Sequence, residues 1–274
     1  MSKPKQVRVI VWSTPRSLST AFLKSMSTFE NAEIFQEPFV SAALFGPDRD
    51  KKTITDEMNA VVENLCSSEY TFDGVKAMLE QEYPDKDVVF SKDGGLFIHG
   101  HFDKIPSGFK HVFLTRKPGK VLASSQKLID SIKGEPHLSC RPNLPGTPHR
   151  QLLETAEYVR DHLNQAPVVI DADDLQMKPQ EVMRAFCEQV GLPFSEKMMT
   201  WKQGPDPRWR QSPFKKMACE MMTANHEKAF NSTGFDKHIP SSEPALEEMN
   251  EVTRTMVTKA QPYYDKLMTM KLKI

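Results

Sequence analysis

A run of hydroxyl and guanidinium side chains follows the first apolar segment of the chain. Residues 7–13 are mostly β-branched and apolar, and the sequence then reads Thr14-Pro15-Arg16-Ser17-Leu18-Ser19-Thr20 before the apolar spacing of a helix begins. A strand that turns directly into a helix directs backbone N–H groups, and the positive end of the helix dipole, at one point. Arg16 adds a planar fork of donors, and the neighbouring hydroxyl groups add more. These residue types at this spacing suit the binding of a phosphate group.

This stretch differs from the phosphate loop of ordinary nucleoside triphosphatases. That loop reads G-x-x-x-x-G-K-[ST], where glycines let the backbone approach the phosphates and the hydroxyl binds magnesium. The chain has neither the glycines nor the lysine at these positions. A second interpretation is a Ser/Thr-rich cap on an ordinary helix, because such residues are favoured at helix starts.

A second basic residue stands at another predicted junction between strand and helix. Residues 110–117 are expected to form a strand, and Pro118 suits the first turn of the helix that follows. Arg116 lies at the tip of this strand, and Ser124 comes eight residues later, inside the helix. The two side chains could therefore converge on a second anion.

The two junctions together resemble the motifs of a known family. Pro15-Arg16-Ser17-x-Ser19-Thr20 resembles the 5′-phosphosulfate loop of sulfotransferases, and Arg116-x-Pro118-x-x-x-x-x-Ser124 resembles their 3′-phosphate motif. The resemblance implies the donor 3′-phosphoadenosine 5′-phosphosulfate (PAPS), with adenosine 3′,5′-bisphosphate as product. It implies these cofactor-binding residues: Pro15, Arg16, Ser17, Leu18, Ser19, Thr20, Arg116 and Ser124. Family loops usually carry glycine where this chain has Leu18, so the backbone is expected to lie slightly farther from the phosphosulfate.

The last third of the chain resembles one subfamily more loosely. Residues 201–210 contain two tryptophans around a Gly-Pro pair, and residues 231–235 read Asn-Ser-Thr-Gly-Phe. These segments resemble a sulfotransferase-like subfamily that includes the P-loop part of branched-chain aminotransferase-like proteins. They could wrap the adenine side of the cofactor, or the tryptophans could only pack the loop.

Three side chains are the first candidates for the chemistry of sulfonate transfer. Glu37 precedes Pro38, which ends the pairing of a strand predicted at 32–36, and Lys92 lies near the end of another strand. In a parallel sheet these ends meet where ligands bind. We expect a metal-free in-line transfer in which Arg16, helped by Lys92, stabilises the charge that develops on the leaving phosphate oxygen. Glu37 is the expected base, or alternatively forms an ion pair with Arg16 or Lys92.

Two histidines are alternatives to Glu37 as the base. His101, preceded by His99, lies a little after the third predicted strand, where the resemblance places the base of many cytosolic sulfotransferases. Their H-x-H spacing could also fit a metal, although no metal site is predicted. A base in this position typically contributes a rate factor of about 100 to 10,000.

Composition sets the class of protein. The 274 residues contain 36 Lys and Arg and 36 Asp and Glu, so no net charge recruits nucleic acid or an anionic membrane. No apolar stretch approaches the ~18 residues of a membrane span, and the N-terminus shows no signal region. The four cysteines lack metal spacing. We expect a cytoplasmic protein with a small-molecule acceptor and no nucleic-acid or membrane partner; the oligomeric state stays open.

The order of elements predicts the fold. Apolar strands alternate with helices, which favours a three-layer α/β/α arrangement with a mainly parallel sheet, the P-loop NTPase-like sulfotransferase fold. We expect one domain over 1–274. Asp171 follows an apolar strand and is expected to cap a helix rather than bind magnesium. The proline-rich residues 135–148 are expected to form a lid over the acceptor, and residues 243–271 a covering amphipathic helix.

Two other functions are open at this point. A nucleotide kinase or NTPase could share the fold, although the missing lysine and magnesium ligands disfavour it. A catalytically idle nucleotide-binding protein is the other alternative. The five polar groups expected at one sheet edge disfavour it: Arg16, Glu37, Lys92, Arg116 and Ser124.

Overall fold

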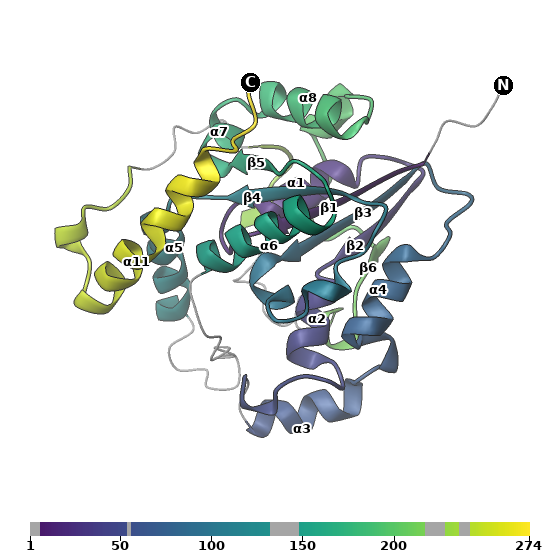
Figure 1. Ribbon diagram of the computed structural model, residues 1–274, viewed down its shortest axis with the longest axis horizontal. Coiled ribbons are helices and arrows are strands. Elements are labelled where there is room, and N and C mark those ends of the chain that lie inside the picture. The colour runs from purple at the N-terminus through teal and green to yellow at the C-terminus, as the bar shows by residue number, and fades with distance from the viewer. Residues whose placement is uncertain (1–5, 54–55, 132–147, 217–227, 236–241) are drawn as a thin grey trace.

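A parallel sheet forms the centre of the molecule (Figure 1). The computed structural model describes residues 6–53, 56–131, 148–216, 228–235 and 242–274. Within these ranges the sheet has six strands, all parallel, in the order β5-β4-β1-β3-β2-β6. The strands are β1 (Val7–Ser13), β2 (Ala32–Gln36), β3 (Val88–Gly94), β4 (Lys110–Thr115), β5 (Val168–Asp171) and β6 (Trp209–Arg210). The predicted α/β class with a mainly parallel sheet is confirmed.

Helices cover both faces of this sheet, which explains why its strands read as nearly continuous apolar runs. On β1, Val9 and Val11 join a core with Phe22 and Phe186, whose rings meet edge to face at 4.9 Å between centroids. Ile10 and Trp12 point to the opposite core. The first face is covered by α1 (Ser19–Met26), α7 (Ala172–Met177) and α8 (Pro179–Val190). The second is covered by α2 (Pro38–Phe45), α4 (Phe72–Glu80), α6 (Pro148–His162) and α11 (Glu251–Met268).

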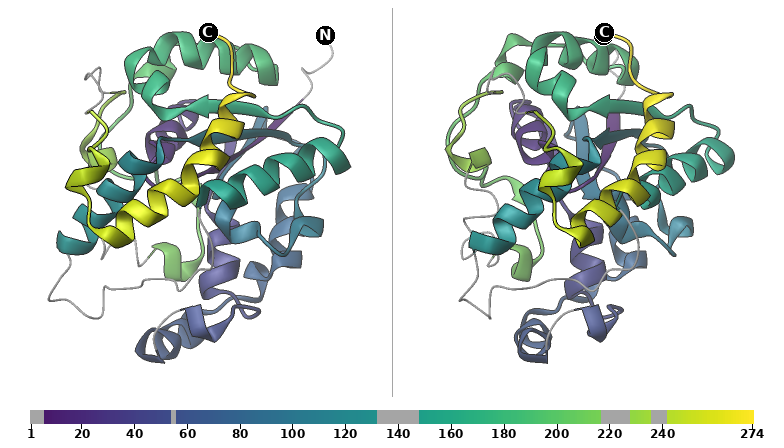
Figure 2. Two further views of the ribbon diagram at one scale, coloured as in Figure 1. Left: turned by 60° about the vertical axis from the view of Figure 1, so that its left-hand side comes forward. Right: turned by 90° about the vertical axis from the view of Figure 1, so that its left-hand side faces the viewer.

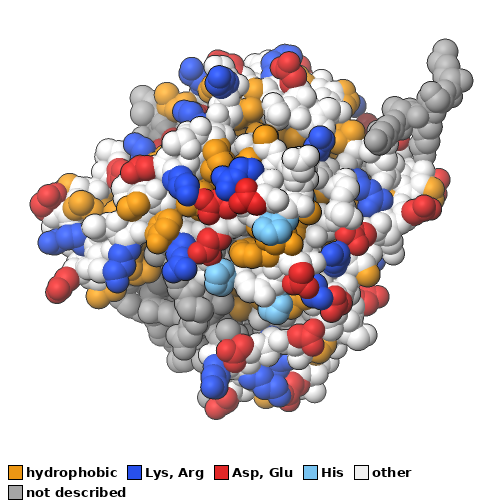
Figure 3. All heavy atoms as spheres, in the orientation of Figure 1, with side chains coloured by type: hydrophobic (Ala, Val, Ile, Leu, Met, Phe, Trp, Pro, Cys, Tyr) orange, Lys and Arg blue, Asp and Glu red, His pale blue; other side chains and the backbone are white. Residues whose placement is uncertain are grey.

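The remaining described elements are shorter or peripheral. Helix α3 (Asp56–Leu65) contributes Val62 to a small core beside α2, and α5 (Pro118–Ser131) follows β4. Single 3₁₀ turns occupy Lys51–Thr53, Ser68–Tyr70, Gly95–Ile98, Phe102–Lys104, Glu196–Met199 and Leu246–Glu248. None of the described helices is both long and apolar enough to cross a membrane. On the face seen in Figure 3, basic and acidic side chains are interspersed, in line with their equal numbers.

Several helix boundaries follow from local chemistry. Pro118 begins α5 as predicted, Pro179 begins α8, and Gly191 ends α8 with a left-handed backbone at φ 79°. The covering helix α11 is shorter than the predicted range 243–271. It begins only at Glu251, because the side chain of Asn250 accepts the N–H of Thr253 and caps it there. Figure 2 shows α11, in yellow, lying along α5 and α6.

One helix was missed by the sequence reasoning. Directly after Glu37 the chain turns into α2, with Pro38 in its first turn. The carboxylate of Asp93 accepts the N–H groups of Phe39 at 2.7 Å and Val40 at 3.1 Å. This cap comes from the neighbouring strand, so no local pattern around Glu37 announced it.

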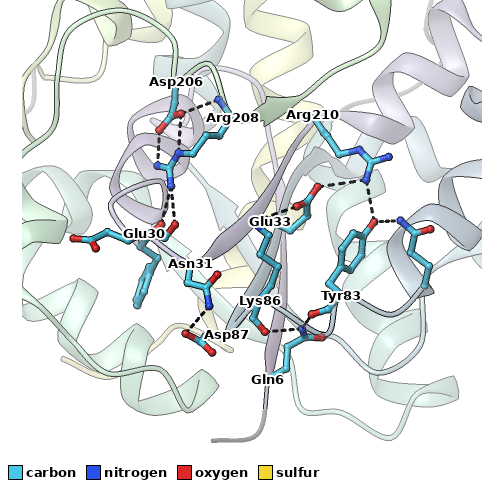
Figure 4. A network of polar contacts seen from close by, with 12 residues as sticks. Gln6, Glu30, Asn31, Glu33, Tyr83, Lys86, Asp87, Asp206, Arg208 and Arg210 are labelled. Carbon is cyan, nitrogen blue, oxygen red and sulfur yellow. Dashed lines mark hydrogen bonds and ion pairs between the residues drawn. The ribbon is translucent and has the colours of Figure 1, made fainter. Parts of the chain in front are cut away.

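A polar network holds β6 to the amino end of β2 (Figure 4). The guanidinium of Arg208 pairs with Asp206 and donates to the backbone carbonyl oxygens of Ser27, Phe29 and Glu30. Arg210 pairs with Glu33 on β2 at 3.3 Å. These contacts lie at the opposite end of the strands from the predicted site, and they fix the start of the segment that continues toward residue 216.

Candidate active site

The loop between β1 and α1 has the shape of an anion-binding turn. Its backbone is fixed where the N–H of Thr14 donates to the Leu114 carbonyl at 3.0 Å. The hydroxyl of Ser17 donates to the Thr14 carbonyl at 2.7 Å and is fully buried. The side chain of Ser17 therefore braces the loop, and only its backbone N–H is left to serve a ligand.

Two residues of the loop have left-handed backbones. Arg16 has φ 61° and Leu18 has φ 66°. Leu18 thus adopts the conformation that glycine takes most readily, at a cost of about 1–2 kcal/mol for a residue with a Cβ. Its side chain packs against the core under α1, which offsets this strain. The expected effect of Leu18 on the distance to a phosphosulfate stays a prediction.

The first turn of α1 presents backbone donors. Its first intrahelical hydrogen bond runs from the N–H of Phe22 to the Leu18 carbonyl at 3.0 Å, and Leu18 makes no side-chain cap. The N–H groups of Ser19, Thr20 and Ala21 therefore precede the regular helical bonding and point out of the helix end. This is the geometry that binds phosphate at helix starts.

The structure brings the two predicted phosphate motifs together. The guanidinium Nε of Arg16 donates to the hydroxyl oxygen of Ser124 at 3.0 Å, although 108 residues separate them. The pKa of Arg16 is lowered, first by burial and second by the positive charge of Arg116. Two guanidinium groups that repel each other beside a hydroxyl are stabilised by an anion. The junctions at β1 and β4 thus form one basic site.

Arg116 is held in place by side chains from the next strand and helix. Its Nε contacts Asp173 at 3.2 Å, and its terminal nitrogen donates to Gln176 at 3.4 Å. Behind it, Nε2 of the buried His149 lies 2.8 Å from the Arg116 carbonyl oxygen. Burial lowers the pKa of His149, so the neutral ring donates this hydrogen bond near pH 7.

Sequence reasoning missed two charged partners in this region. Lys120 pairs with Asp173 at 2.6 Å, and both side chains are largely buried. Asp173 lies in the first turn of α7, where Asp171 accepts the N–H groups of residues 173 and 174. The predicted cap at Asp171 is confirmed, and the carboxylate also accepts the hydroxyl of Tyr264 at 2.5 Å. The available signal was the spacing of Lys120, four residues before Ser124 and therefore on the same face of the predicted helix.

A second charged cluster lies at the ends of β2 and β3. Glu37 has a left-handed backbone at φ 56°, and its N–H donates to the Lys92 carbonyl at 2.7 Å. The carboxylate pairs with the ammonium groups of Lys92 and Lys215, one on each oxygen. The ion pair foreseen as the alternative for Glu37 is therefore present with Lys92. Lys215 was missed, although the Ser212-Pro213 pair is a helix-start pattern: the Lys215 N–H donates to the Ser212 hydroxyl at 3.1 Å.

Asp93 is a buried neighbour of this cluster. Besides the two N–H groups of α2, it accepts the N–H of Gly94 at 2.8 Å. Complete burial raises the pKa of Asp93 to about 7, and the charge of Glu37 adds to this effect. Asp93 thus fixes the start of α2, and with it the position of Glu37.

The two candidate histidines contact other parts of the fold. His99 pairs through Nδ1 with Glu154 of α6 at 3.0 Å. The ring of His101 stacks on Phe72 at 3.8 Å between centroids and an interplanar angle of 14°. Phe72 in turn stacks on Phe39, so His101 approaches α2 only through an intervening ring. Glu37 and Lys92, by contrast, touch each other.

The tryptophan-containing residues 201–210 and the turn at 231–235 mainly pack against the core and against each other in the described region. The indole of Trp209 donates to the hydroxyl of Ser27 at 2.7 Å and belongs to the core. Trp201 donates to Ser232 at 3.1 Å, and its ring meets Phe235 edge to face. For Trp209 the packing interpretation holds. The predicted lid at 135–148 lies outside the described residues except at Pro148, the first residue of α6.

Comparison with known proteins shows which family this site resembles. Residues 7–139 match the family model described as "Sulfotransferase domain". Over these residues the chain is similar to a sulfotransferase domain. The match contains every residue that the motifs singled out, from Pro15 to Ser124, whereas Asp173 and Lys215 lie beyond it. The resemblance read from the motifs is confirmed, and the match supports a sulfotransferase-type function.

Relatives of the sulfotransferase domain occur in larger proteins. The chain is 28% identical over 214 residues to "Branched-chain-amino-acid aminotransferase-like protein 1" of Arabidopsis thaliana, covering 76% of this chain and 34% of that protein. The corresponding protein 2 is 28% identical over 210 residues, with 72% and 32% covered. The chain thus spans about a third of the length of these relatives.

One solved sulfotransferase domain shares the architecture. "Sulfotransferase Domain from the Synechococcus PCC 7002 Olefin Synthase" superposes with a TM-score of 0.51 at 14% identity, over 96% of this chain and 97% of that one. "Sulfotransferase Domain from the Curacin Biosynthetic Pathway" gives 0.48 at 15% identity, over 95% and 99%. At 14% identity the superposition on the olefin synthase domain establishes that this chain has the sulfotransferase fold, and only the fold.

Proposed function

We propose that the protein transfers the sulfonate of PAPS to a hydroxyl or amine of a small-molecule acceptor, without a metal. The observation that carries this proposal is the hydrogen bond from Arg16 to Ser124 beside the positive charge of Arg116. It joins the loop at β1 to the junction at β4, as one nucleotide with phosphates at both its 5′ and 3′ positions requires.

The two ends of the donor have separate supports in this proposal. The 5′-phosphosulfate lies against the loop of residues 15–20 and the N–H groups of the first turn of α1. The 3′-phosphate is bound by Arg116 and Ser124, on the adjacent strand end and helix. Because β1 and β4 are neighbours in the sheet, both supports face the same edge. One domain over 1–274 supplies them.

The transfer forms one bond to sulfur and breaks another. The acceptor oxygen or nitrogen attacks sulfur, the bond to the bridging oxygen of the 5′-phosphate breaks, and adenosine 3′,5′-bisphosphate leaves. Arg16 stabilises the negative charge that develops on this oxygen, with Lys92 as helper. The acceptor proton passes to Glu37. In this scheme Lys92 contacts both the leaving phosphate oxygen and the carboxylate of Glu37. A shift of Lys92 toward the leaving oxygen would release one carboxylate oxygen of Glu37, and this carboxylate oxygen then acts as the base.

Ligand-dependent stability separates this proposal from its alternatives. Adenosine 3′,5′-bisphosphate at a hundred times its dissociation constant should stabilise the protein by about 2.7 kcal/mol, which is roughly 5–10 °C in melting temperature for a chain of this size. Stabilisation by ATP with magnesium instead would favour a kinase or NTPase, and no effect of either nucleotide would favour an idle fold. Transfer of labelled sulfonate from PAPS to a panel of alcohols, phenols and amines then identifies the acceptor.

A further inference from the structure

Lys120 lies in the basic site but outside the motifs that define it. It belongs to the first turn of α5, four residues before Ser124, so the two side chains share one face of the helix. Its side chain is 8% exposed, which is unusual for lysine, and its ammonium contacts Asp173 at 2.6 Å. Because lysine is rarely this buried unless it is paired, we expect Lys120 to have a role other than keeping the surface soluble.

Asp173 joins Lys120 to Arg116. One carboxylate oxygen contacts the ammonium of Lys120, and the other contacts Nε of Arg116 at 3.2 Å. Asp173 is itself fixed by its position in the first turn of α7, which Asp171 caps. The shared carboxylate therefore sets the positions of both cations relative to Ser124.

Three cations come together beside Ser124 in the described part of the chain. Arg16 donates to Ser124, and Arg116 and Lys120 share the carboxylate of Asp173. Glu243 accepts the backbone N–H of Gly119 at 3.0 Å. An ammonium has three N–H donors. Within the described part of the chain Lys120 directs one of them to Asp173, so two are available for the oxygens of a phosphate.

We propose that Lys120 is a third ligand of the nucleotide 3′-phosphate, positioned by Asp173, and that it contributes to the preference for a 3′-phosphorylated nucleotide. This inference rests on the proposed function, since it concerns the same donor. A phosphate monoester carries about −1.5 to −2 charge at pH 7. A third cation therefore strengthens binding of adenosine 3′,5′-bisphosphate and leaves binding of adenosine 5′-phosphate nearly unchanged.

The test is the ratio of two dissociation constants, measured by calorimetric titration. Lys120→Met should weaken adenosine 3′,5′-bisphosphate by about tenfold or more, the range of a charge-assisted contact, and adenosine 5′-phosphate by less than about twofold. Lys120→Arg should retain most of the preference. Lys117→Met is the matched control, because Lys117 is exposed on the same turn, and it should change neither constant. Lys120→Met with Asp173→Asn removes both charges, in case the single variant folds poorly.

The outcomes separate the inference from the function on which it rests. If Lys120→Met and the double variant keep the wild-type ratio, or lose both nucleotides equally, Lys120 only shapes the loop and the inference is wrong. If the wild-type protein binds both nucleotides with equal affinity, the proposed PAPS site itself is wrong. A collapsed ratio in Lys120→Met with a normal ratio in Lys117→Met supports the assignment.

Discussion

Replacing Glu37 by glutamine removes one negative charge between two ammonium groups while keeping the size of the side chain. The side chains of Lys92 and Lys215 are 3% and 12% exposed, so they lose their counter-charge in a largely water-free place. Breaking a buried ion pair costs about 3–5 kcal/mol. We expect the free energy of unfolding to fall toward the lower end of that range, because the glutamine oxygen still accepts one hydrogen bond.

Turnover should fall much further than stability explains. A glutamine cannot accept the acceptor proton, so turnover is expected to drop about 100- to 10,000-fold, the usual contribution of a general base. The affinity for adenosine 3′,5′-bisphosphate should stay nearly unchanged, because the 3′-phosphate side is built from β4 and α5. The assay is sulfonate transfer at saturating PAPS, well below the melting temperature of the variant.

The matched control is Glu33→Gln, on the strand that leads to Glu37. Glu33 pairs with Arg210 at the amino end of β2, away from the candidate site. This variant should lose stability but keep turnover. Near-normal turnover in Glu37→Gln, together with an inactive His101→Ala, would refute the assignment of Glu37 and transfer the role of base to the histidine.

Three further variants examine the rest of the site. Arg116→Ala should weaken adenosine 3′,5′-bisphosphate by about 1.5–3 kcal/mol and adenosine 5′-phosphate much less, measured by titration; equal losses would remove Arg116 from the 3′-phosphate site. Lys215→Met should shift the acid limb of the pH–rate profile upward, because a carboxylate that loses a neighbouring cation protonates more readily, whereas the exposed Lys216→Met should leave it in place. For Asp93, burial raises the folded-state pKa from 3.8 to about 7, so its contribution to stability is full below about pH 4 and is lost as the pH rises through about 7. Asp93→Asn should flatten this dependence in urea unfolding between pH 4 and 8, and an unchanged slope would place the titration elsewhere.

Local sequence determined most of the elements and the types of residue at the site. Continuous apolar runs predicted the buried parallel strands, because both faces of such strands are covered. Pro118 and Pro179 marked helix starts through their fixed φ, and Asp171 marked a cap through its short acceptor side chain. The two phosphate motifs were also local, since each lies within one junction of strand and helix.

Tertiary structure alone decided which of these groups meet. The sheet order places β1 beside β4, which brings Arg16 to Ser124, and places β2 beside β3, which brings the end of β2 to Lys92. Lys120 lies at a position that the Arg116–Ser124 motif leaves open, and Asp173 and Lys215 come from segments whose own patterns carry no mark of an anion site. Helix and strand patterns report only on neighbours within a few residues. A contact between charges far apart in the chain depends on strand order and on burial, which strengthens the contact by excluding water.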